Sequence, residues 1–464
     1  MESVNPATGE RLETYDDHTE EDVDRALDRA SEAFGEWRDR PINERQVLLS
    51  RAAEVLRENQ EEYAELMTEE MGKPIVEARA EVEKCAWVCD FYAERADEFL
   101  ADEVLGSEPE SRSLVSYEPL GTVLAVMPWN FPFWQVFRFA APHLTAGNVG
   151  VLKHASNVPG CAKAIEEVFT EAGYPEDVFT TLLVGSDTID DVIRDDRVAA
   201  VTLTGSEGAG RSVGETAGSE IKKSVLELGG SDPFVVLEDA DVEAAAATGV
   251  QARTINSGQS CIAAKRFIVH EDVYDEFVEE FVAETEALSM GDPMDEDTDI
   301  GPQAREDLVE DVHEQVEGTV EAGAELRTGG ERPDGEGNFY PPTVLTEVPR
   351  DAPAATEEVF GPAAAVFRVG SEEEAIEVAN DIEFGLGASI WTEDLERGER
   401  LARRVEAGCV FVNELVKSDP RIPFGGVKNS GYGRELAEQG IHEFVNRKTV
   451  WVQSPEGPDD VATE

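Results

Sequence analysis

The sequence lacks any apolar run that is long enough to cross a membrane. A membrane-spanning helix needs about 18 or more consecutive apolar residues, and the runs in this chain are much shorter. The first ten residues, MESVNPATGE, also lack the basic and apolar segments that make up a secretory signal peptide. These absences predict a cytoplasmic protein with no signal peptide and no membrane-spanning segment.

Basic residues are scarce in this chain. It has 39 lysines and arginines against 100 aspartates and glutamates, a formal net charge of −61, and only ten of the basic residues are lysines. This charge excludes nucleic acid and anionic membrane surfaces as partners, because both are negatively charged. The acidic residues are spread along the whole chain, which favours a halophilic protein, since charge repulsion is screened within about 3 Å at 1 M salt. An ordinary acidic enzyme is the alternative hypothesis.

Cysteine is also rare, with five residues at irregular spacing. This pattern excludes a disulfide framework and indicates a reducing compartment. Cys85 and Cys89 lie four apart, on one face of a helix predicted from residue 75 to about 99. Because no second pair of metal ligands follows them, the sequence predicts that both pack in the core and that there is no metal site.

What is present indicates an α/β protein with more than one domain. The 464 residues are 41% hydrophobic, enough for two or three domains. Apolar residues at helical spacing predict helices from residue 20 to about 100. Short apolar runs then alternate with helical segments and predict a parallel, doubly wound sheet, with strands at 122–127, 148–153, 179–184, 199–203 and 223–228.

A second region of alternating strands and helices begins near residue 234. Its strands are predicted at 234–237, 267–270, 340–345, 363–368, 388–391 and 409–413, and its helices at 242–256, 273–287, 304–322 and 372–380. A last strand is predicted at 449–453. The tail that follows, 454–464, is predicted to be disordered.

Three motifs lie at the ends of predicted strands, where open α/β sheets bind their ligands. Asn130 lies in a stiff loop, PWNFP, directly after the first strand of the sheet. Lys153 ends the next strand, and a glycine-rich turn, TGSEGAG (204–210), leads from another strand into a helix. Such a turn can present backbone N–H groups to a pyrophosphate. An ordinary strand–helix turn and a surface lysine are the alternative interpretations.

Two further residues fit covalent catalysis. Cys261 follows a small, glycine-containing turn, SGQS (257–260), whose N–H groups can favour the reactive thiolate. Glu227 lies in an apolar strand, where burial raises the pKa of a carboxyl toward neutrality and suits it as a general base. Taken singly, the cysteine fits a small core residue equally well. The glutamate alone fits a structural carboxylate with a partner.

Taken together, these motifs resemble those of the aldehyde dehydrogenase superfamily. The resemblance extends from Asn5 to Trp451 and rests on seven motifs in the family's order: PWNFP (128–132), LKHAS (152–156), LTGS (203–206), LELGG (226–230), GQSC (258–261), EEVFGP (357–362) and PFGG (423–426). The separation of 34 residues between Glu227 and Cys261 also suits the family.

The resemblance implies an α/β, aldehyde-dehydrogenase-like fold with three parts. These are a Rossmann-like dinucleotide-binding domain (1–108 and 120–228), an α/β catalytic domain (229–432), and a small bridging oligomerisation sheet (109–119 and 433–464). The bridging strands would leave an unpaired edge in a monomer, so a homodimer or homotetramer is expected.

The resemblance also implies NAD(P)-dependent oxidation of an aldehyde to a carboxylic acid through a cysteine thiohemiacetal and thioester. In this chemistry Cys261 is the nucleophile, and the Asn130 amide and the Cys261 N–H bind the oxyanion. Glu227 activates the water that hydrolyses the thioester. The residues that match the family's cofactor site are Trp129, Lys153, Ser156, Gly205, Ser206, Gly210, Glu358 and Phe360.

Ser156 bears on the choice of cofactor. Family members that prefer NAD often carry a glutamate at this position, where it bonds the ribose hydroxyls and repels a 2′-phosphate. Serine removes that repulsion, so NADP should be accepted, whereas the acidic surface opposes an extra phosphate. The sequence therefore predicts NADP or NAD.

Arg138 and Ser418 bear on the substrate. Semialdehyde dehydrogenases of the family use an arginine and a serine at these positions for the substrate's far carboxylate, and an arginine fork suits a carboxylate. The segments KHASN (153–157) and LELGGSDPF (226–234) look most like those of succinate-semialdehyde dehydrogenases. The alternatives are 2-oxoglutarate semialdehyde, glycolaldehyde or an aliphatic aldehyde as substrate, a CoA-acylating enzyme, which Glu227 argues against, and a non-catalytic protein.

Overall fold

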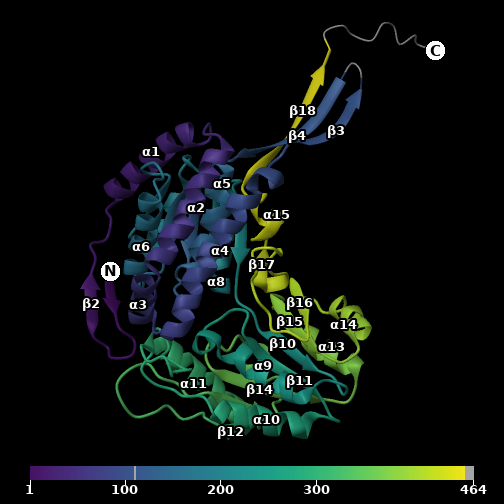
Figure 1. Cartoon of the computed structure of the whole chain (residues 1–464). Helices are drawn as coiled ribbons and strands as arrows, with labels where there is room; N and C mark the ends of the chain where they lie inside the picture. Colours follow the sequence, from purple (N-terminus) through teal and green to yellow (C-terminus); the bar gives the residue numbers. More distant parts are fainter. Residues whose placement is uncertain (109–110, 455–464) are drawn as a thin grey trace, which may run out of the picture.

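The computed structural model describes residues 1–108 and 111–454. Within them the chain forms two large α/β bodies and a smaller sheet that projects away from both (Figure 1). Apart from Ser454, the tail predicted to be disordered lies outside the described residues.

The chain begins with a short antiparallel hairpin and four helices. Their bounds are β1 (Glu2–Val4), β2 (Arg11–Thr14), α1 (Glu20–Trp37), α2 (Ile42–Glu58), α3 (Gln60–Met71) and α4 (Ile75–Phe99). Thr19 and Asp22 form a capping box that starts α1. Gly72 ends α3 in the left-handed conformation, and Pro74 precedes α4, so these two residues separate the helices. The hairpin was not predicted, because β2 is exposed along its whole length and shows no apolar alternation.

The first large sheet is parallel except for its edge strand β17. Its order is β17 (Gly431–Tyr432), β9 (Lys223–Glu227), β8 (Val198–Thr204), β5 (Thr122–Met127), β6 (Val149–His154) and β7 (Phe179–Thr181). The helices between its strands are α5 (Trp134–Ala146), α6 (Pro159–Glu171), α7 (Ile189–Arg194) and α8 (Glu207–Ser219). The predicted doubly wound sheet is confirmed, although the strand predicted at 179–184 ends three residues earlier.

The second large sheet is parallel except for β12. Its order is β12 (Glu325–Thr328), β13 (Thr343–Thr346), β14 (Ala363–Val369), β11 (Ala264–His270), β10 (Asp232–Val236), β15 (Gly387–Trp391) and β16 (Cys409–Val412). Its helices are α9 (Val242–Thr254), α10 (Tyr274–Glu286), α11 (Glu306–Glu321), α12 (Pro353–Thr356), α13 (Glu372–Asn380) and α14 (Leu395–Ala402). The strand predicted at 340–345 is shorter and later, because Pro341 and Pro342 precede it and cannot donate to a ladder.

The third sheet is antiparallel and extends beyond the two α/β bodies (Figure 1). It consists of β18 (Val445–Gln453), β4 (Ser111–Pro119) and β3 (Glu103–Glu108), and β18 pairs with β4 along its whole length. The strand predicted at 449–453 therefore begins four residues earlier. β3 belongs to this sheet although the segment 1–108 was predicted to lie in the cofactor domain. The short helix α15 (Ala437–Ile441) instead contacts α4, where the Tyr92 hydroxyl donates to the Ala437 carbonyl oxygen (2.9 Å).

The buried apolar residues form three clusters. One joins the N-terminal helices to the first sheet, and the other two cover the two faces of the second sheet. Cys85 and Cys89 lie fully buried in the first cluster, so their predicted packing in the core is confirmed. Within the described residues, no helix combines the length and apolar content that a membrane span requires.

Candidate active site

The turn that carries Cys261 lies between α9 and β11 and has a strained backbone. Asn256 and Ser257 adopt left-handed φ angles of 52° and 53°, so the predicted helix ends before them. Gly258 follows with a φ of 78°, and a Cβ atom there would lie 2.4 Å from the carbonyl carbon of Gly361. The turn packs against this backbone so closely that only glycine fits at position 258.

The far side of the turn is held by the buried ammonium of Lys265. It donates to the carbonyl oxygens of Ser260 (2.9 Å) and Cys261 (2.8 Å), and it lies 3.5 Å from the carboxylate of Glu358. Burial raises the pKa of the Cys261 thiol to about 12, although the charges of Lys265 and Arg138 act in the opposite direction. At neutral pH the thiol is therefore protonated, and it must lose this proton before it can react.

Asn130, in the loop after β5, lies against the same turn. Its Nδ2 atom donates to the carbonyl oxygen of Gln259 (2.9 Å), two residues before Cys261. The Asn256 side chain donates in turn to the carbonyl oxygen of Asn130 (2.6 Å). Because an amide nitrogen carries two N–H groups, Asn130 retains one for a further acceptor. The fold thus brings the PWNFP loop and the GQSC turn together from the two large sheets.

Two glutamates of α4 hold this loop and this turn in place. Glu77 accepts a hydrogen bond from the backbone N–H of Asn256 (2.7 Å). One oxygen of Glu81 accepts from the N–H groups of Phe133 (3.0 Å) and Trp134 (2.9 Å), where α5 begins. Helix α4 therefore ties both segments to a single rigid element.

The sequence motifs do not point to either glutamate. A weaker signal is present, because Glu81 shares a helical face with Ala78, Val82 and Cys85, all of which are buried. A charged residue on such a face needs partners. The second oxygen of Glu81 pairs with the buried ammonium of Lys73, which offsets the cost of burying its charge.

Glu227 ends β9 and is 2% exposed. Within the described ranges, neither oxygen of its carboxylate has a hydrogen-bond partner. Gly425 approaches so closely that a Cβ atom there would lie 2.6 Å from one of these oxygens. Burial, together with the negative charge of Glu435, raises the pKa of Glu227 well above its ordinary value. The carboxylate therefore does not form a structural ion pair in the described part of the chain, and its role as a general base stays a prediction that these properties fit.

Arg138 lies in α5 and is 2% exposed. Its guanidinium pairs with the buried carboxylate of Glu435 and lies 3.4 Å from the hydroxyl of Thr204. It also lies over the ring of Phe424, 4.9 Å from the ring centre. Arg138 already has a carboxylate partner inside the protein, and its contact with a substrate carboxylate stays a prediction.

Ser418 is buried and contacts a different cation. Its hydroxyl oxygen accepts a hydrogen bond from the Lys84 ammonium of α4 (2.8 Å). The same ammonium lies 4.2 Å from the ring centre of Trp134. No sequence motif singles out Lys84, because a lysine on a long helix is usually a solvated surface residue.

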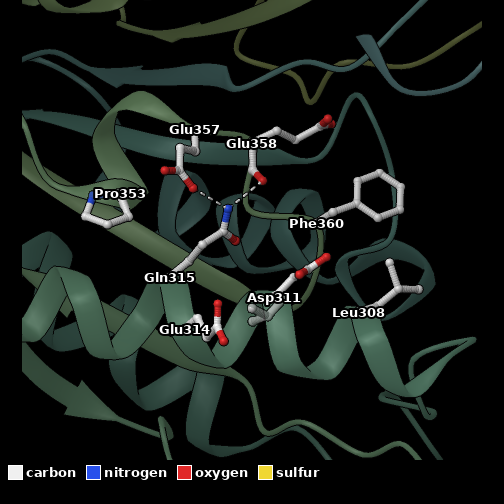
Figure 2. Close-up of a pocket in the computed structure, with 9 residues that line it drawn as sticks. Leu308, Asp311, Glu314, Gln315, Pro353, Glu357, Glu358 and Phe360 are labelled. Atoms are coloured by element: carbon white, nitrogen blue, oxygen red, sulfur yellow. Dashed lines mark hydrogen bonds between the residues drawn. The ribbon is translucent and has the colours of Figure 1, made fainter. Parts of the chain in front are cut away.

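Two of the predicted cofactor residues line a cavity of about 340 Å³ between α11 and the EEVFGP segment (Figure 2). They are Glu358 and Phe360. Gln315 of α11 positions this segment by donating to the Glu357 carboxylate (2.9 Å) and to the carbonyl oxygen of Glu358 (3.2 Å). The ring of Trp129, from the PWNFP loop, lies edge-on to Phe360 with the ring centres 5.8 Å apart. The two large bodies therefore meet beside these predicted cofactor residues.

The other predicted cofactor residues belong to the first sheet. Lys153 lies near the carboxyl end of β6, with Ser156 in the loop that follows, and burial alone lowers the pKa of the Lys153 ammonium. Ser206 caps α8, which follows the Gly205 turn, and a Cβ atom at Gly210 would lie 2.5 Å from Leu228. A helix N-terminus, an ammonium and a serine hydroxyl at one sheet edge fit a dinucleotide.

Two joined α/β bodies carry a cysteine turn, a neighbouring amide and a buried glutamate, the arrangement that the resemblance to aldehyde dehydrogenases implies. The model of the aldehyde dehydrogenase family matches residues 1–450. The chain belongs to this family, and the predicted family and fold class are confirmed.

The chain is similar to relatives that are named for one reaction. It is 56% identical to a probable succinate-semialdehyde dehydrogenase [NADP(+)] of Synechocystis, over 97% of this chain and 99% of that protein. It is 52% identical to succinate-semialdehyde dehydrogenase [NADP(+)] 1 of Mycobacterium tuberculosis, with the same coverage. Among solved structures, the succinic semialdehyde dehydrogenase of Streptococcus pyogenes in complex with NADP+ is 40% identical, with a TM-score of 0.95 over 98% of this chain and 100% of that chain.

Proposed function

We propose that this chain oxidises succinate semialdehyde to succinate, with NADP or NAD as the cofactor. The observation that carries the proposal is the contact between the Asn130 amide and the turn of Cys261, which joins an oxyanion donor to a nucleophile. The similarity to relatives named for this reaction, over 97% of the chain, supports the choice of substrate.

The chain's own residues account for the steps of this reaction. The Cys261 thiol first gives up its proton to a water molecule, and the thiolate then attacks the aldehyde carbon, so that the carbonyl oxygen becomes an oxyanion. The remaining N–H of the Asn130 amide and the Cys261 N–H donate to this oxygen, and the loss of one such donor typically costs about 2.7–4 kcal/mol. When bound, NADP or NAD supplies the acceptor for the hydride that leaves the same carbon. Glu227 then takes a proton from the water that hydrolyses the Cys261 thioester.

A panel of aldehydes tests the substrate assignment. Values of kcat/KM would be measured at high KCl with succinate semialdehyde, 2-oxoglutarate semialdehyde, glycolaldehyde and butanal, each with both cofactors. We expect succinate semialdehyde to exceed the others by at least about tenfold, which corresponds to about 1.4 kcal/mol of transition-state binding. A higher kcat/KM for another aldehyde would make that aldehyde the substrate and would leave the proposed reaction at Cys261 unchanged. Acyl-CoA as the main product when CoA is present would favour the CoA-acylating alternative.

Exchanging Ser156 for glutamate tests the cofactor assignment. A carboxylate in this loop, three residues after Lys153, would repel a 2′-phosphate. In Ser156→Glu we expect KM for NADP to rise at least about tenfold and KM for NAD to change less than about threefold. Ser156→Ala is the uncharged control and should leave the KM for NADP within about threefold of the original value. An equal rise for both cofactors in the glutamate variant would show that this position does not face the 2′-phosphate.

We further propose that the protein is adapted to high salt. Its net charge of −61 makes the folded state repel itself, and the repulsion is screened within about 3 Å at 1 M salt. We expect the melting temperature to rise by about 5–10 °C or more between 0.1 and 3 M KCl. A melting curve by circular dichroism at several KCl concentrations measures this rise, and a flat or falling curve contradicts the proposal.

We also propose a cytoplasmic homodimer or homotetramer in which the projecting third sheet makes the contact. Val104 and Leu105 of β3 and Trp451 of β18 are 57%, 59% and 66% exposed in the single chain. Apolar side chains on a projecting sheet favour burial against a second copy. The molar mass in solution, by light scattering, tests this proposal and distinguishes the two assemblies.

A further inference from the structure

The carbonyl oxygens on both sides of the Cys261 Cα atom contact one buried ammonium. The Nζ atom of Lys265 lies 2.9 Å from the carbonyl oxygen of Ser260 and 2.8 Å from that of Cys261. These oxygens belong to the two planar peptide groups that flank the Cys261 Cα atom, so a single cation restrains both planes. The two planes together set the direction of the Cα–Cβ bond that carries the sulfur.

The contact with Ser260 bears directly on the proposed oxyanion donor. The carbonyl of Ser260 and the N–H of Cys261 are the two ends of one trans peptide group, so they point in opposite directions. The Ser260 oxygen accepts hydrogen bonds from Lys265 and from the N–H of Ala263 (3.1 Å). Among the residues that the structure describes, the Cys261 N–H makes no hydrogen bond. One end of this peptide group is therefore anchored, and the opposite end is free for an external acceptor.

The charge of Lys265 strengthens this donor. A cation at the carbonyl oxygen polarises the peptide group and makes its N–H a better hydrogen-bond donor. The side chain is 1% exposed, so water screens the effect little. Burial lowers the pKa of Lys265, and the carboxylates of Glu358 and Asp232 act in the opposite direction. Three acceptors surround the nitrogen, the two carbonyl oxygens and the Glu358 carboxylate (3.5 Å), and they match the three N–H groups of an ammonium.

The ammonium is carried by a rigid element. Lys265 is the second residue of β11, which lies between β14 and β10 inside the second large sheet. The Cys261 carbonyl oxygen also packs against the LELGG segment, where a Cβ atom at Gly230 would lie 2.8 Å from it. A group on an inner strand holds its position more precisely than a group on a loop.

We propose that Lys265 is a positioning residue for the oxyanion site of the proposed reaction. By holding the carbonyl oxygen of Ser260, it aims the Cys261 N–H at the carbonyl oxygen of the substrate, and its charge makes this N–H a stronger donor. Lys265 therefore acts on every substrate that forms an oxyanion at Cys261. The inference rests on the proposed function, because it takes Cys261 as the nucleophile.

Two reactions of Cys261 that need no cofactor test this role. With p-nitrophenyl acetate, the thiolate attacks the carbonyl carbon, an oxyanion forms, and nitrophenolate leaves an acetylated cysteine. With iodoacetamide, the thiolate displaces iodide and no oxyanion forms. Both reactions require the thiolate, so the ratio of their rate constants cancels any change in the pKa of the thiol. The ratio of acetylation to alkylation thus reports the stabilisation of the oxyanion.

The variant is Lys265→Met, which keeps an unbranched side chain and removes the charge. We expect the ratio to fall at least about tenfold in the full-length enzyme. The loss is smaller than for removal of an oxyanion donor, because the N–H of Ala263 still holds the Ser260 oxygen. Released nitrophenolate and the mass of the intact chain measure the two rates, and Cys261→Ser gives the background of each. Melting curves would show that the fold is retained.

Lys222→Met is the matched control. Lys222 also donates to two carbonyl oxygens, those of Ile193 (2.6 Å) and Asp195 (2.5 Å), but it directly precedes β9, at the opposite end of this strand from Glu227. Its removal costs the same kind of contact at a distance from the cysteine turn. We expect the ratio of acetylation to alkylation in this variant to stay within about twofold of the original value.

An unchanged ratio in Lys265→Met would overturn the proposal, even if both reactions became slower. If Lys265→Met does not fold, Lys265→Gln decides, because its amide offers a neutral donor: a ratio at least about threefold below the original supports the role, and an equal ratio contradicts it. The ester reaction needs neither aldehyde nor cofactor, so a wrong substrate assignment leaves this test intact. If the ester does not acetylate Cys261 in the original enzyme, the proposed nucleophile fails, and the role of Lys265 fails with it.

Discussion

Replacing Cys261 by serine is expected to lower kcat/KM for aldehyde oxidation by at least about 1,000-fold. The hydroxyl of serine is a far weaker nucleophile than a thiolate, and within the described part of the chain no base lies at hydrogen-bond distance from the partly buried Cys261. The formation of NADPH or NADH from succinate semialdehyde, followed by absorbance, measures the loss. Near-identical melting curves would show that the fold is retained.

Cys409→Ser is the matched control for this variant. Cys409 is the other free cysteine that is only partly buried, and its Sγ atom contacts the carbonyl oxygen of Leu386 (3.5 Å), a bond that a serine hydroxyl can also make. We expect this variant to keep kcat/KM within about threefold of the original value. If activity survives in Cys261→Ser and disappears in Cys409→Ser, the nucleophile is Cys409 and the assignment of Cys261 is wrong.

Replacing Glu227 by glutamine is expected to lower kcat about 100- to 10,000-fold while a first turnover still occurs. An amide cannot accept a proton from water, so the thioester on Cys261 forms and is hydrolysed only slowly. Rapid mixing with succinate semialdehyde should therefore give a burst of reduced cofactor equal to the number of active sites, with little further turnover. The acylated enzyme would be seen as a mass increase of the intact chain.

The pH profile gives a second measure of Glu227. Burial favours its protonated form, and only the deprotonated form acts as a base, so hydrolysis in the original enzyme should increase with pH and level off above the raised pKa. Glu227→Gln should lack this increase. Glu220→Gln, at an exposed glutamate before β9, is the control and should behave as the original enzyme. Loss of the burst itself in Glu227→Gln would mean that Glu227 acts before the thioester forms.

Several parts of the site follow from the sequence because they depend on local constraints. The strand at 122–127 and the proline-bounded loop after it place Asn130 at a sheet edge in any parallel α/β arrangement. The turn before Cys261 needs glycine because its backbone is left-handed and crowded. Such requirements leave recognisable residues at fixed spacing, and these motifs identified the family.

The partners of those residues do not follow from local sequence. Glu77, Glu81 and Lys84 lie on a single helix far from the motifs in the chain. Through the packing of α4, Glu77 contacts the turn of Cys261, Glu81 contacts the segment after the PWNFP loop, and Lys84 contacts Ser418. On sequence alone each of them fits an ordinary amphipathic helix, since a helical period shows which face is buried but not what lies against it.

The sequence by itself thus determined the family, the alternation of strands and helices, and the candidate nucleophile, oxyanion donor and base. Only the tertiary structure decided which charges meet. It pairs Arg138 with Glu435 and places Lys84 beside Ser418, and it leaves the carboxylate of Glu227 without a hydrogen-bond partner among the described residues. The physical reason is that a motif reflects the backbone conformation that neighbouring residues must adopt. Ion pairs and burial depend instead on distances between segments that are remote in the chain.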